Sequence, residues 1–305
     1  MKCLKPITLR NGLTVNCGSC RACRVNRSSS WTLRLLYELD RWDKAAFITL
    51  TYSDEYLPGD FSLHKDELQK FVKRLRARFL YVNRRVSYFA CGEYGDDNRS
   101  SPIGIEHGRP HFHLIVFGVD PDDDDDRKIV ADCWPYCDSF MFDKKRKDNG
   151  IELVNRKTIA YVCGYVQKKL TGNYAKELYE DRERPFMICS KGLGLQFFGK
   201  ARDRISRLGF CYLNGKRLAI PRYFRQKFDI PLDVSAGFRK SKIFEETKIL
   251  KSDFEEYCLK KNLIFSSLDE RMRFFEFWYE NRFMDLSRRI EKNFIDLKRI
   301  KGGKL

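Results

Sequence analysis

Residues 111–118 read His-Phe-His-Leu-Ile-Val-Phe-Gly, an apolar run with two histidines at its start and a glycine at its end. The run is rich in β-branched and aromatic residues, which predicts a strand. Alternate residues of a strand point to opposite faces, so His111 and His113 would lie on one face while Phe112 points into the core. We therefore expect two imidazoles side by side on one face of a sheet.

The segments around this strand predict the rest of a domain. Further strands are expected at residues 46–52, 86–91 and 151–154, and helices at residues 68–79, 129–134 and 158–170. The order strand-helix-strand-strand-helix-strand is that of a ferredoxin-like split βαβ fold with an antiparallel sheet, followed by one more helix. The predicted class is therefore α+β, with a generic α+β sandwich as the alternative.

Helices are also expected on both sides of this domain. Three serines at residues 28–30 predict the N-terminal cap of a helix whose apolar stripe runs from Trp31 to Trp42. Near the C-terminus, apolar residues at steps of three and four predict a long helix over residues 275–297 that packs on the rest of the protein or on a partner. The predicted division is a domain of residues 1–235 and a helical C-terminal region of residues 236–305.

The composition narrows the class of protein. Lys and Arg number 59 against 42 Asp and Glu, a net charge of +17, which predicts a polyanionic partner such as nucleic acid. Residues 200–227 are the most basic segment, and the side chains expected to contact DNA are Lys200, Arg202, Arg204, Arg207, Arg222 and Arg225. No apolar run is long enough to cross a bilayer and the first residues lack the apolar core of a signal peptide, so a cytosolic protein without a membrane partner is expected.

The chain has 11 cysteines, and without a secretory signal we expect reduced thiols, so that a close group of them predicts a metal site. That group consists of Cys3, Cys17, Cys20 and Cys23. Four thiolates would hold a structural Zn²⁺ that fastens the N-terminal arm to the domain. Free thiols or an iron–sulfur cluster are alternatives. In a further alternative, Cys133 and Cys137 join His111 and His113 in a structural metal site.

Two more motifs would complete a catalytic site beside the histidines. Glu93 ends the strand expected to pair with the histidine strand, and its carboxylate would complete a metal-binding face suited to Mg²⁺ or Mn²⁺. Tyr161 and Tyr165 lie one helical turn apart and share a side of the helix with Lys168 and Lys169. A metal-bound phosphate and a nearby lysine would activate a tyrosine hydroxyl as a nucleophile. The alternative is an exposed glutamate and two half-buried tyrosines without a catalytic role.

In this order and at these separations, the motifs resemble the HUH endonucleases, specifically the replication initiators of small single-stranded DNA phages of the gokushovirus-like branch of microviruses. The resemblance rests on AFITLTY at residues 46–52, CGEYG at 91–95, RPHFHLIVFG at 109–118, YVCGYVQKKL at 161–170 and the cysteine-rich NCGSCRACRVNR at 16–27. It extends from residue 1 to about residue 227 and implies the HUH nuclease form of the ferredoxin-like fold.

The resemblance also implies roles for individual residues. It implies that His111 and His113 are metal ligands, with Glu93 as the acidic third ligand. The tyrosine pair would supply the nucleophile for nicking and rejoining single-stranded origin DNA through a 5′-phosphotyrosine, and Lys169 or its neighbour Lys168 would correspond to the family's helix lysine.

The biological expectation is rolling-circle replication in the cytoplasm of a bacterial host. The sequence contains no G-x4-G-K-[ST] nucleotide-binding motif, so a host helicase and polymerase are expected partners. The alternatives are a relaxase or transposase with the same chemistry, and a non-catalytic zinc-containing DNA-binding protein. The order in which the tyrosines act, the origin sequence and the oligomeric state do not follow from the sequence.

Overall fold

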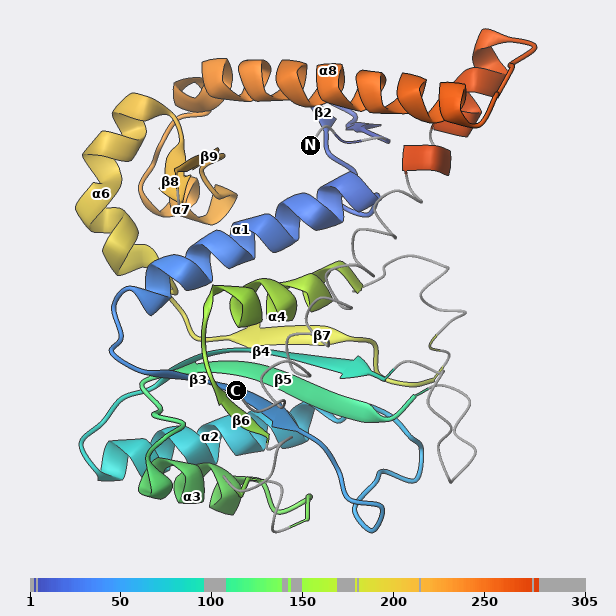
Figure 1. Ribbon diagram of the computed structural model, residues 1–305. Helices are drawn as coiled ribbons and strands as arrows, with labels where there is room; N and C mark the ends of the chain where they lie inside the picture. The colour runs from blue at the N-terminus through green and yellow to red at the C-terminus, as the bar shows by residue number, and fades with distance from the viewer. Residues whose placement is uncertain are drawn as a thin grey trace, which may run out of the picture. The chain divides into compact units, whose positions relative to one another are not determined.

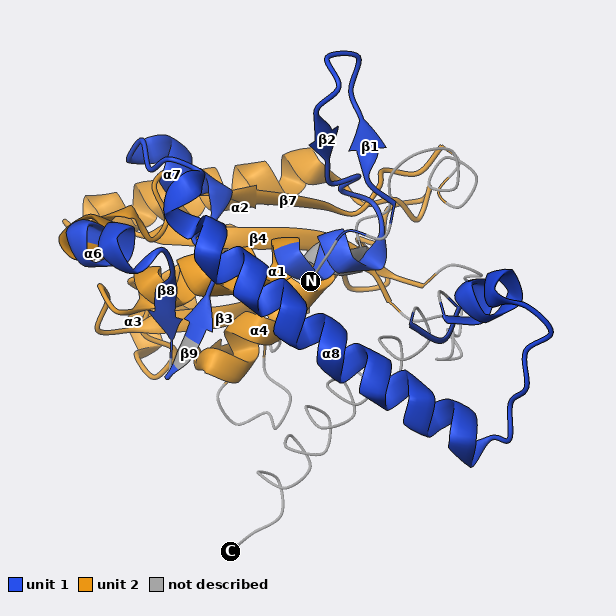
Figure 2. Cartoon of the chain, turned by 90° about the horizontal axis from the view of Figure 1, so that it is seen from above, with its two compact units in different colours: residues 1–26, 202–305 blue, residues 27–201 orange. Residues whose placement is uncertain are grey.

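The computed structural model describes residue 3 and residues 5–95, 108–138, 142–143, 150–168, 179, 181–213, 215–275 and 277–279. The chain divides into two compact units (Figure 2): unit 2 comprises residues 27–201, and unit 1 comprises residues 1–26 and 202–305. The boundary expected at residue 235 falls inside unit 1. The histidine, glutamate and tyrosine motifs all lie in unit 2, whereas the four cysteines near the N-terminus lie in unit 1.

Unit 2 is built on a five-stranded antiparallel sheet (Figure 1). Its strands are β3 (Ala45–Leu50), β4 (Ser87–Tyr94), β5 (Pro110–Phe117), β6 (Ile151–Leu153) and β7 (Phe186–Cys189). The strand order is β6-β3-β5-β4-β7, so the first four strands have the order of a ferredoxin-like sheet and β7 extends it beside β4. The predicted fold class is confirmed. The strand β7 is not among the predicted strands, because a run of four residues carries too little periodicity.

Helices cover both faces of this sheet. Figure 1 shows α2 (Lys65–Tyr81) and α3 (Asp124–Cys133) on one face and α4 (Arg156–Lys168) on the other. Phe112 is fully buried in the core beneath α2, whereas Ile115 and Phe117 pack in the second core with residues of α4. His111 and His113 have the same parity along β5 as Ile115 and Phe117, so they lie on the α4 face, opposite Phe112, as the alternation predicted.

The start of the first helix differs from the prediction. The helix α1 runs over Arg21–Leu39, so the serines at residues 28–30 lie inside it and do not cap it. Ser28 is buried, and its hydroxyl donates a 2.7 Å hydrogen bond to the main-chain carbonyl of Cys163 in α4. The cap prediction was wrong because a tertiary contact, which sequence spacing does not reveal, satisfies a serine that otherwise favours a helix end.

Unit 1 contains two short hairpins and the C-terminal helices. Its elements are β1 (Ile7–Thr8), β2 (Thr14–Val15), β8 (Cys211–Leu213), β9 (Lys216–Leu218), α7 (Arg222–Lys227), the short 3-10 helix Asp233–Ser235 and α8 (Ala236–Lys260); α6 (Leu195–Leu208) enters it from unit 2. Of the helix expected at residues 275–297, only residues 275 and 277–279 are described. They include Trp278 and Tyr279, which pack with Phe254 and Cys258 of α8. None of the described helices is both long and apolar enough to span a membrane.

Candidate active site

The pairing of three strands brings the predicted metal ligands together. In the register of the sheet, Glu93 of β4 lies directly opposite His111 of β5, and Thr49 of β3 lies opposite His113. Side chains that face one another across an antiparallel pair point to the same side of the sheet. Glu93, His111 and His113 therefore converge on the face that α4 covers.

The ligand atoms of these three residues lie within 4.8 Å of one another. The Oε1 atom of Glu93 is 3.0 Å from Nε2 of His111 and 3.3 Å from Nε2 of His113. Glu93 and His113 are 4% and 6% exposed, while His111 is half-buried. A buried carboxylate shared by two imidazoles is costly to assemble unless a cation accompanies it, so the donor set fits a metal ion.

The other ring nitrogens orient the two imidazoles. His111 donates from Nδ1 to the main-chain carbonyl of Arg109, with 3.0 Å between the atoms, and Nδ1 of His113 lies 3.2 Å from the Thr49 hydroxyl. An imidazole that donates through Nδ1 presents the lone pair of Nε2 on its other side, which is the tautomer that a metal requires. Thr49 is not among the residues singled out in the sequence. Its position opposite His113 depends on the strand register, and no local motif signals it.

The carboxyl group of Glu93 is ionised in this environment. Burial acts to raise its pKa, but hydrogen bonds and charge interactions with His111 and His113 lower the pKa to about 2. The carboxylate is therefore negative at neutral pH and available as an acidic metal ligand.

The predicted tyrosine pair lies directly beside this group. The ring of Tyr165 stacks on His113 with 4.8 Å between the centroids and 6° between the planes, and Tyr161 meets the same histidine edge to face at 5.8 Å. The hydroxyl of Tyr165 donates a hydrogen bond to the hydroxyl of Tyr161. Both hydroxyls therefore serve one place at the metal group.

The two tyrosines differ in their surroundings. Tyr165 is 8% exposed, whereas Tyr161 is half-buried. Burial, the negative charge of Glu93 and the neighbouring Tyr161 all raise the pKa of Tyr165. The phenol is thus neutral near pH 7, and removing its proton requires a positive charge nearby or a base.

The remaining predicted residues fall into two groups. Lys168 is the last residue of α4, and Lys169 lies outside the described residues. Cys133 and Cys137 pack in the core on the face of the sheet that α2 and α3 cover, while the histidines face α4. The alternative in which these cysteines join the histidines at one metal is therefore wrong, because the sheet separates them.

The basic side chains expected to contact DNA differ in accessibility. Those on α6 are exposed, namely Lys200, Arg202, Arg204 and Arg207. Steps of four and three place three of them, Lys200, Arg204 and Arg207, on one side of the helix. On α7, Arg222 is exposed and Arg225 is half-buried. Burial, together with the positive charges of Arg239 and Arg222, lowers the pKa of Arg225.

The second predicted metal group is also assembled. The four Sγ atoms of Cys3, Cys17, Cys20 and Cys23 lie within 4.8 Å of one another. Burial acts to raise the pKa of the Cys17 thiol, but hydrogen bonds from Cys20, Ser19 and Cys3 lower it to about 6. A thiol with this pKa is largely ionised at neutral pH.

Known proteins resemble the same part of the chain. Residues 45–170 match the family model of replication-associated protein ORF2, and this segment contains Glu93, His111, His113 and both tyrosines. Replication-associated protein VP4 of Bdellovibrio phage phiMH2K is 32% identical over 222 residues, covering 68% of this chain and 65% of the relative. No solved structure matches the chain.

Two further relatives have names of the same kind. Replication-associated protein ORF4 of Chlamydia phage 1 is 29% identical over 68% of this chain and 52% of its own length. Replication-associated protein ORF2 of Spiroplasma virus 4 is 29% identical over 71% of this chain and 68% of its own length. The matched part of the chain thus spans just under two thirds of the first relative and about half of the second. The resemblance predicted from the motifs is confirmed: the chain is a relative of the phage replication-associated proteins, and its residues 45–170 belong to the replication-associated protein ORF2 family.

Proposed function

We propose that the chain is a metal-dependent endonuclease and strand transferase that starts rolling-circle replication of single-stranded DNA. The observation that carries this proposal is the position of Tyr161 and Tyr165, whose rings pack on His113 of the Glu93–His111–His113 group. A purely structural metal site has no need of two hydroxyls beside it. The phage relatives, all replication-associated proteins by name, support the same role.

In this proposal Glu93, His111 and His113 hold Mg²⁺ or Mn²⁺. A bound divalent cation would draw electrons from the scissile phosphate and balance its negative charge. The Nδ1 contacts of the two imidazoles keep Nε2 directed at Glu93, so the ligands are positioned before a metal arrives. The zinc predicted for the four cysteines is a separate, structural metal.

The chemical step belongs to the tyrosines. The oxygen of Tyr161 or Tyr165 attacks the phosphorus and gives up its proton, the bond between phosphorus and O3′ breaks, and O3′ takes up a proton. The products are a 5′-phosphotyrosine and a strand with a free 3′-hydroxyl. Because the two hydroxyls touch, the second tyrosine can attack the regenerated origin and release the first strand as a closed circle.

The products define the partners. A free 3′-hydroxyl is a primer for a DNA polymerase, and strand separation requires a helicase, both of which the bacterial host would supply. The proposed place of action is therefore the cytoplasm of a bacterium, consistent with relatives from phages of Bdellovibrio, Chlamydia and Spiroplasma.

A covalent trapping experiment tests the reaction. The full chain is incubated with Mn²⁺ and single-stranded oligonucleotides that carry a random central region, labelled at either the 3′ or the 5′ end. We expect the 3′ label to migrate with the protein on a denaturing gel and the 5′ label to remain on free DNA, because the tyrosine keeps the 5′ phosphate. Non-covalent binding alone, or attachment of the 5′ label, would refute the proposal.

Thr49 should act as a positioning residue for His113. Without the hydroxyl at Nδ1, the imidazole is free to turn or change tautomer, so we expect Thr49→Val to raise the Mn²⁺ concentration needed for half-maximal nicking by about 10- to 100-fold. Saturating Mn²⁺ should restore most of the rate, and Thr49→Ser should behave like the unaltered protein. An unchanged metal dependence in a folded Thr49→Val variant would show that the contact does not orient the ring.

The basic side of α6 should contribute to DNA affinity in a salt-dependent way. A variant with Lys200→Gln, Arg204→Gln and Arg207→Gln loses three possible phosphate contacts, so the slope of log K against log salt should become shallower by about 2 for single-stranded DNA. The measurement is fluorescence anisotropy over a range of NaCl concentrations.

The matched control for this triple variant removes three exposed charges from α2: Lys73→Gln, Arg76→Gln and Arg78→Gln. The helix α2 covers the face of the sheet opposite the tyrosines, so its variant should keep the original slope (Figure 1). Equal slopes for both triple variants would mean that the α6 residues form an ordinary solvated surface.

A further inference from the structure

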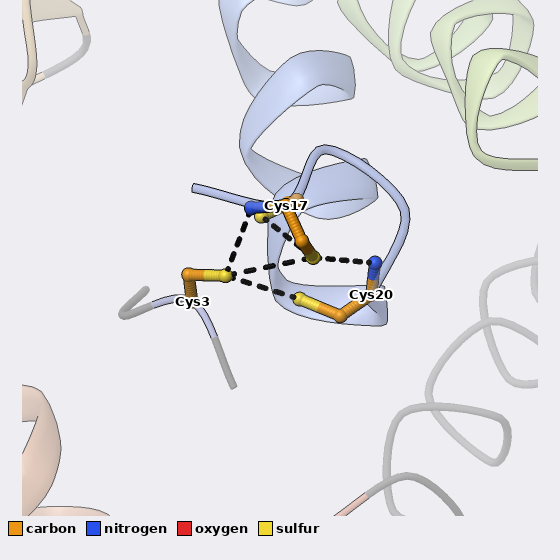
Figure 3. A group of neighbouring side chains, drawn as sticks. Cys3, Cys17 and Cys20 are labelled. Atoms are coloured by element: carbon orange, nitrogen blue, oxygen red, sulfur yellow. Dashed lines mark hydrogen bonds between the residues drawn. The ribbon is translucent and has the colours of Figure 1, made fainter. Parts of the chain in front are cut away.

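The cysteine cluster has the dimensions of a tetrahedral metal site. The Sγ atom of Cys3 lies 3.6 Å from that of Cys17 and 3.9 Å from that of Cys20, and the Sγ atoms of Cys17 and Cys23 are 4.0 Å apart (Figure 3). Four sulfurs at about 2.3 Å from one zinc ion are about 3.8 Å from each other. The observed separations agree with that value to about 0.2 Å, and they are far longer than the roughly 2.05 Å of a disulfide.

The backbone turns the three ligands of the Cys-x2-Cys-x2-Cys motif toward one point. Gly18, directly after Cys17, has a φ of +75°, a left-handed conformation that lets the chain fold back on itself. Cys23 then stands in the first turn of α1. Figure 3 shows Cys3, Cys17 and Cys20 pointing toward one another from the two chain segments.

Main-chain amides support the sulfurs in the way that thiolates bound to a metal require. The amide of Cys17 donates to Sγ of Cys3, and the amide of Cys20 donates to Sγ of Cys17, each over 3.3 Å. Such N–H donors spread the negative charge of thiolates and fix their orientation. Four thiols packed this closely gain little from one another without a cation, because a thiol is a weak donor and a weak acceptor.

The N-terminal hairpin has no hydrophobic core to hold it. Residues 5–14, which contain β1 and the first residue of β2, are all exposed, and Ile7 and Leu13 are 50% and 58% exposed. An isolated two-stranded hairpin is only marginally stable in water. Cys3 precedes this hairpin and Cys17 follows it, and both enter the cluster. Closing the hairpin at both ends through one ion would supply the stability that apolar burial does not.

From these observations we infer that Cys3, Cys17, Cys20 and Cys23 bind one structural Zn²⁺, which fastens both ends of the β1–β2 hairpin to the first turn of α1. Soft thiolate ligands select zinc over Mg²⁺ or Mn²⁺. An iron–sulfur cluster would place several irons and sulfides between the cysteines and hold their sulfurs further apart. This site lies outside the segment of residues 45–170 and is independent of the proposed nicking reaction.

The test measures the metal of the full chain by mass spectrometry and X-ray absorption. It is done in the His111→Ala/His113→Ala variant, so that no zinc at the histidines is counted. After purification under reducing conditions and dialysis, we expect about one zinc per chain with four sulfur neighbours at about 2.3 Å. Cys17→Ser and Cys20→Ser should each lower the zinc content at least about fivefold, whereas the control Cys137→Ser should keep it.

Hydrogen exchange measures what the ion does to the structure. In Cys17→Ser, amides of the hairpin should exchange at least about tenfold faster while β5 keeps its protection, which shows that the chain is still folded. Cys17→His, which retains a zinc ligand, should restore both the metal content and the protection. A folded, reduced chain without zinc, one that holds iron, a mass two or four hydrogens lower from disulfides, or zinc bound by nitrogen and oxygen would each overturn the inference.

Discussion

His113→Ala should lower the rate of nicking by about 10³-fold or more while leaving the affinity for single-stranded DNA nearly unchanged. A divalent cation at a phosphate stabilises the transition state by several kcal/mol, and each 1.36 kcal/mol changes the rate tenfold. Affinity depends mainly on basic side chains that contact phosphates, so a lost metal ligand should hardly affect it. His111→Ala should behave in the same way, because its Nε2 lies 3.0 Å from the shared Glu93 oxygen.

The rates are measured with a 3′-labelled oligonucleotide selected by covalent trapping, and the affinities by anisotropy without added metal. His64→Ala is the matched control, because His64 is partly exposed at the start of α2 and outside the metal group. It should nick at the original rate. Nicking at the original rate by a folded His111→Ala or His113→Ala variant in Mn²⁺ would exclude these histidines as ligands.

Changing both tyrosines to phenylalanine should abolish covalent attachment, with a loss of about 10⁴-fold or more in nicking. No other oxygen nucleophile would then remain at the metal group, and water attack would leave no adduct. Each single variant should retain part of the cleavage of a short oligonucleotide, because the hydroxyls of Tyr161 and Tyr165 touch and serve the same place. Each should nevertheless fail in repeated rounds on a circular template, which need both hydroxyls.

Peptide mass spectrometry of the trapped adduct identifies the attacking residue. Tyr81→Phe is the control, since this tyrosine is 89% exposed at the end of α2 and has no place in the proposed reaction. An adduct on any tyrosine other than Tyr161 or Tyr165, or full nicking by the double variant, would refute the assignment. Persistence of DNA binding in the double variant would separate loss of chemistry from loss of the fold.

Local spacing predicted the elements that carry the site. The alternation in residues 111–118 placed Phe112 in one core and the two histidines on the other face, because strand geometry leaves no other arrangement. The spacing of Tyr161 and Tyr165 placed both rings on one side of α4, since four residues are close to one helical turn. The spacing of the cysteines pointed to one cluster, and their sulfurs do lie together.

What the sequence could not predict depends on contacts between distant segments. Glu93 opposes His111, and Thr49 opposes His113, only because strands pair in one register, and a shift by one residue would turn each side chain to the other face. The added strand β7 and the start of α1 have the same origin: neighbours far away in sequence provide the hydrogen bonds, as Cys163 does for Ser28. Periodicity specifies which face of an element is apolar, whereas partner, register and end are set by the free energy of packing the whole chain.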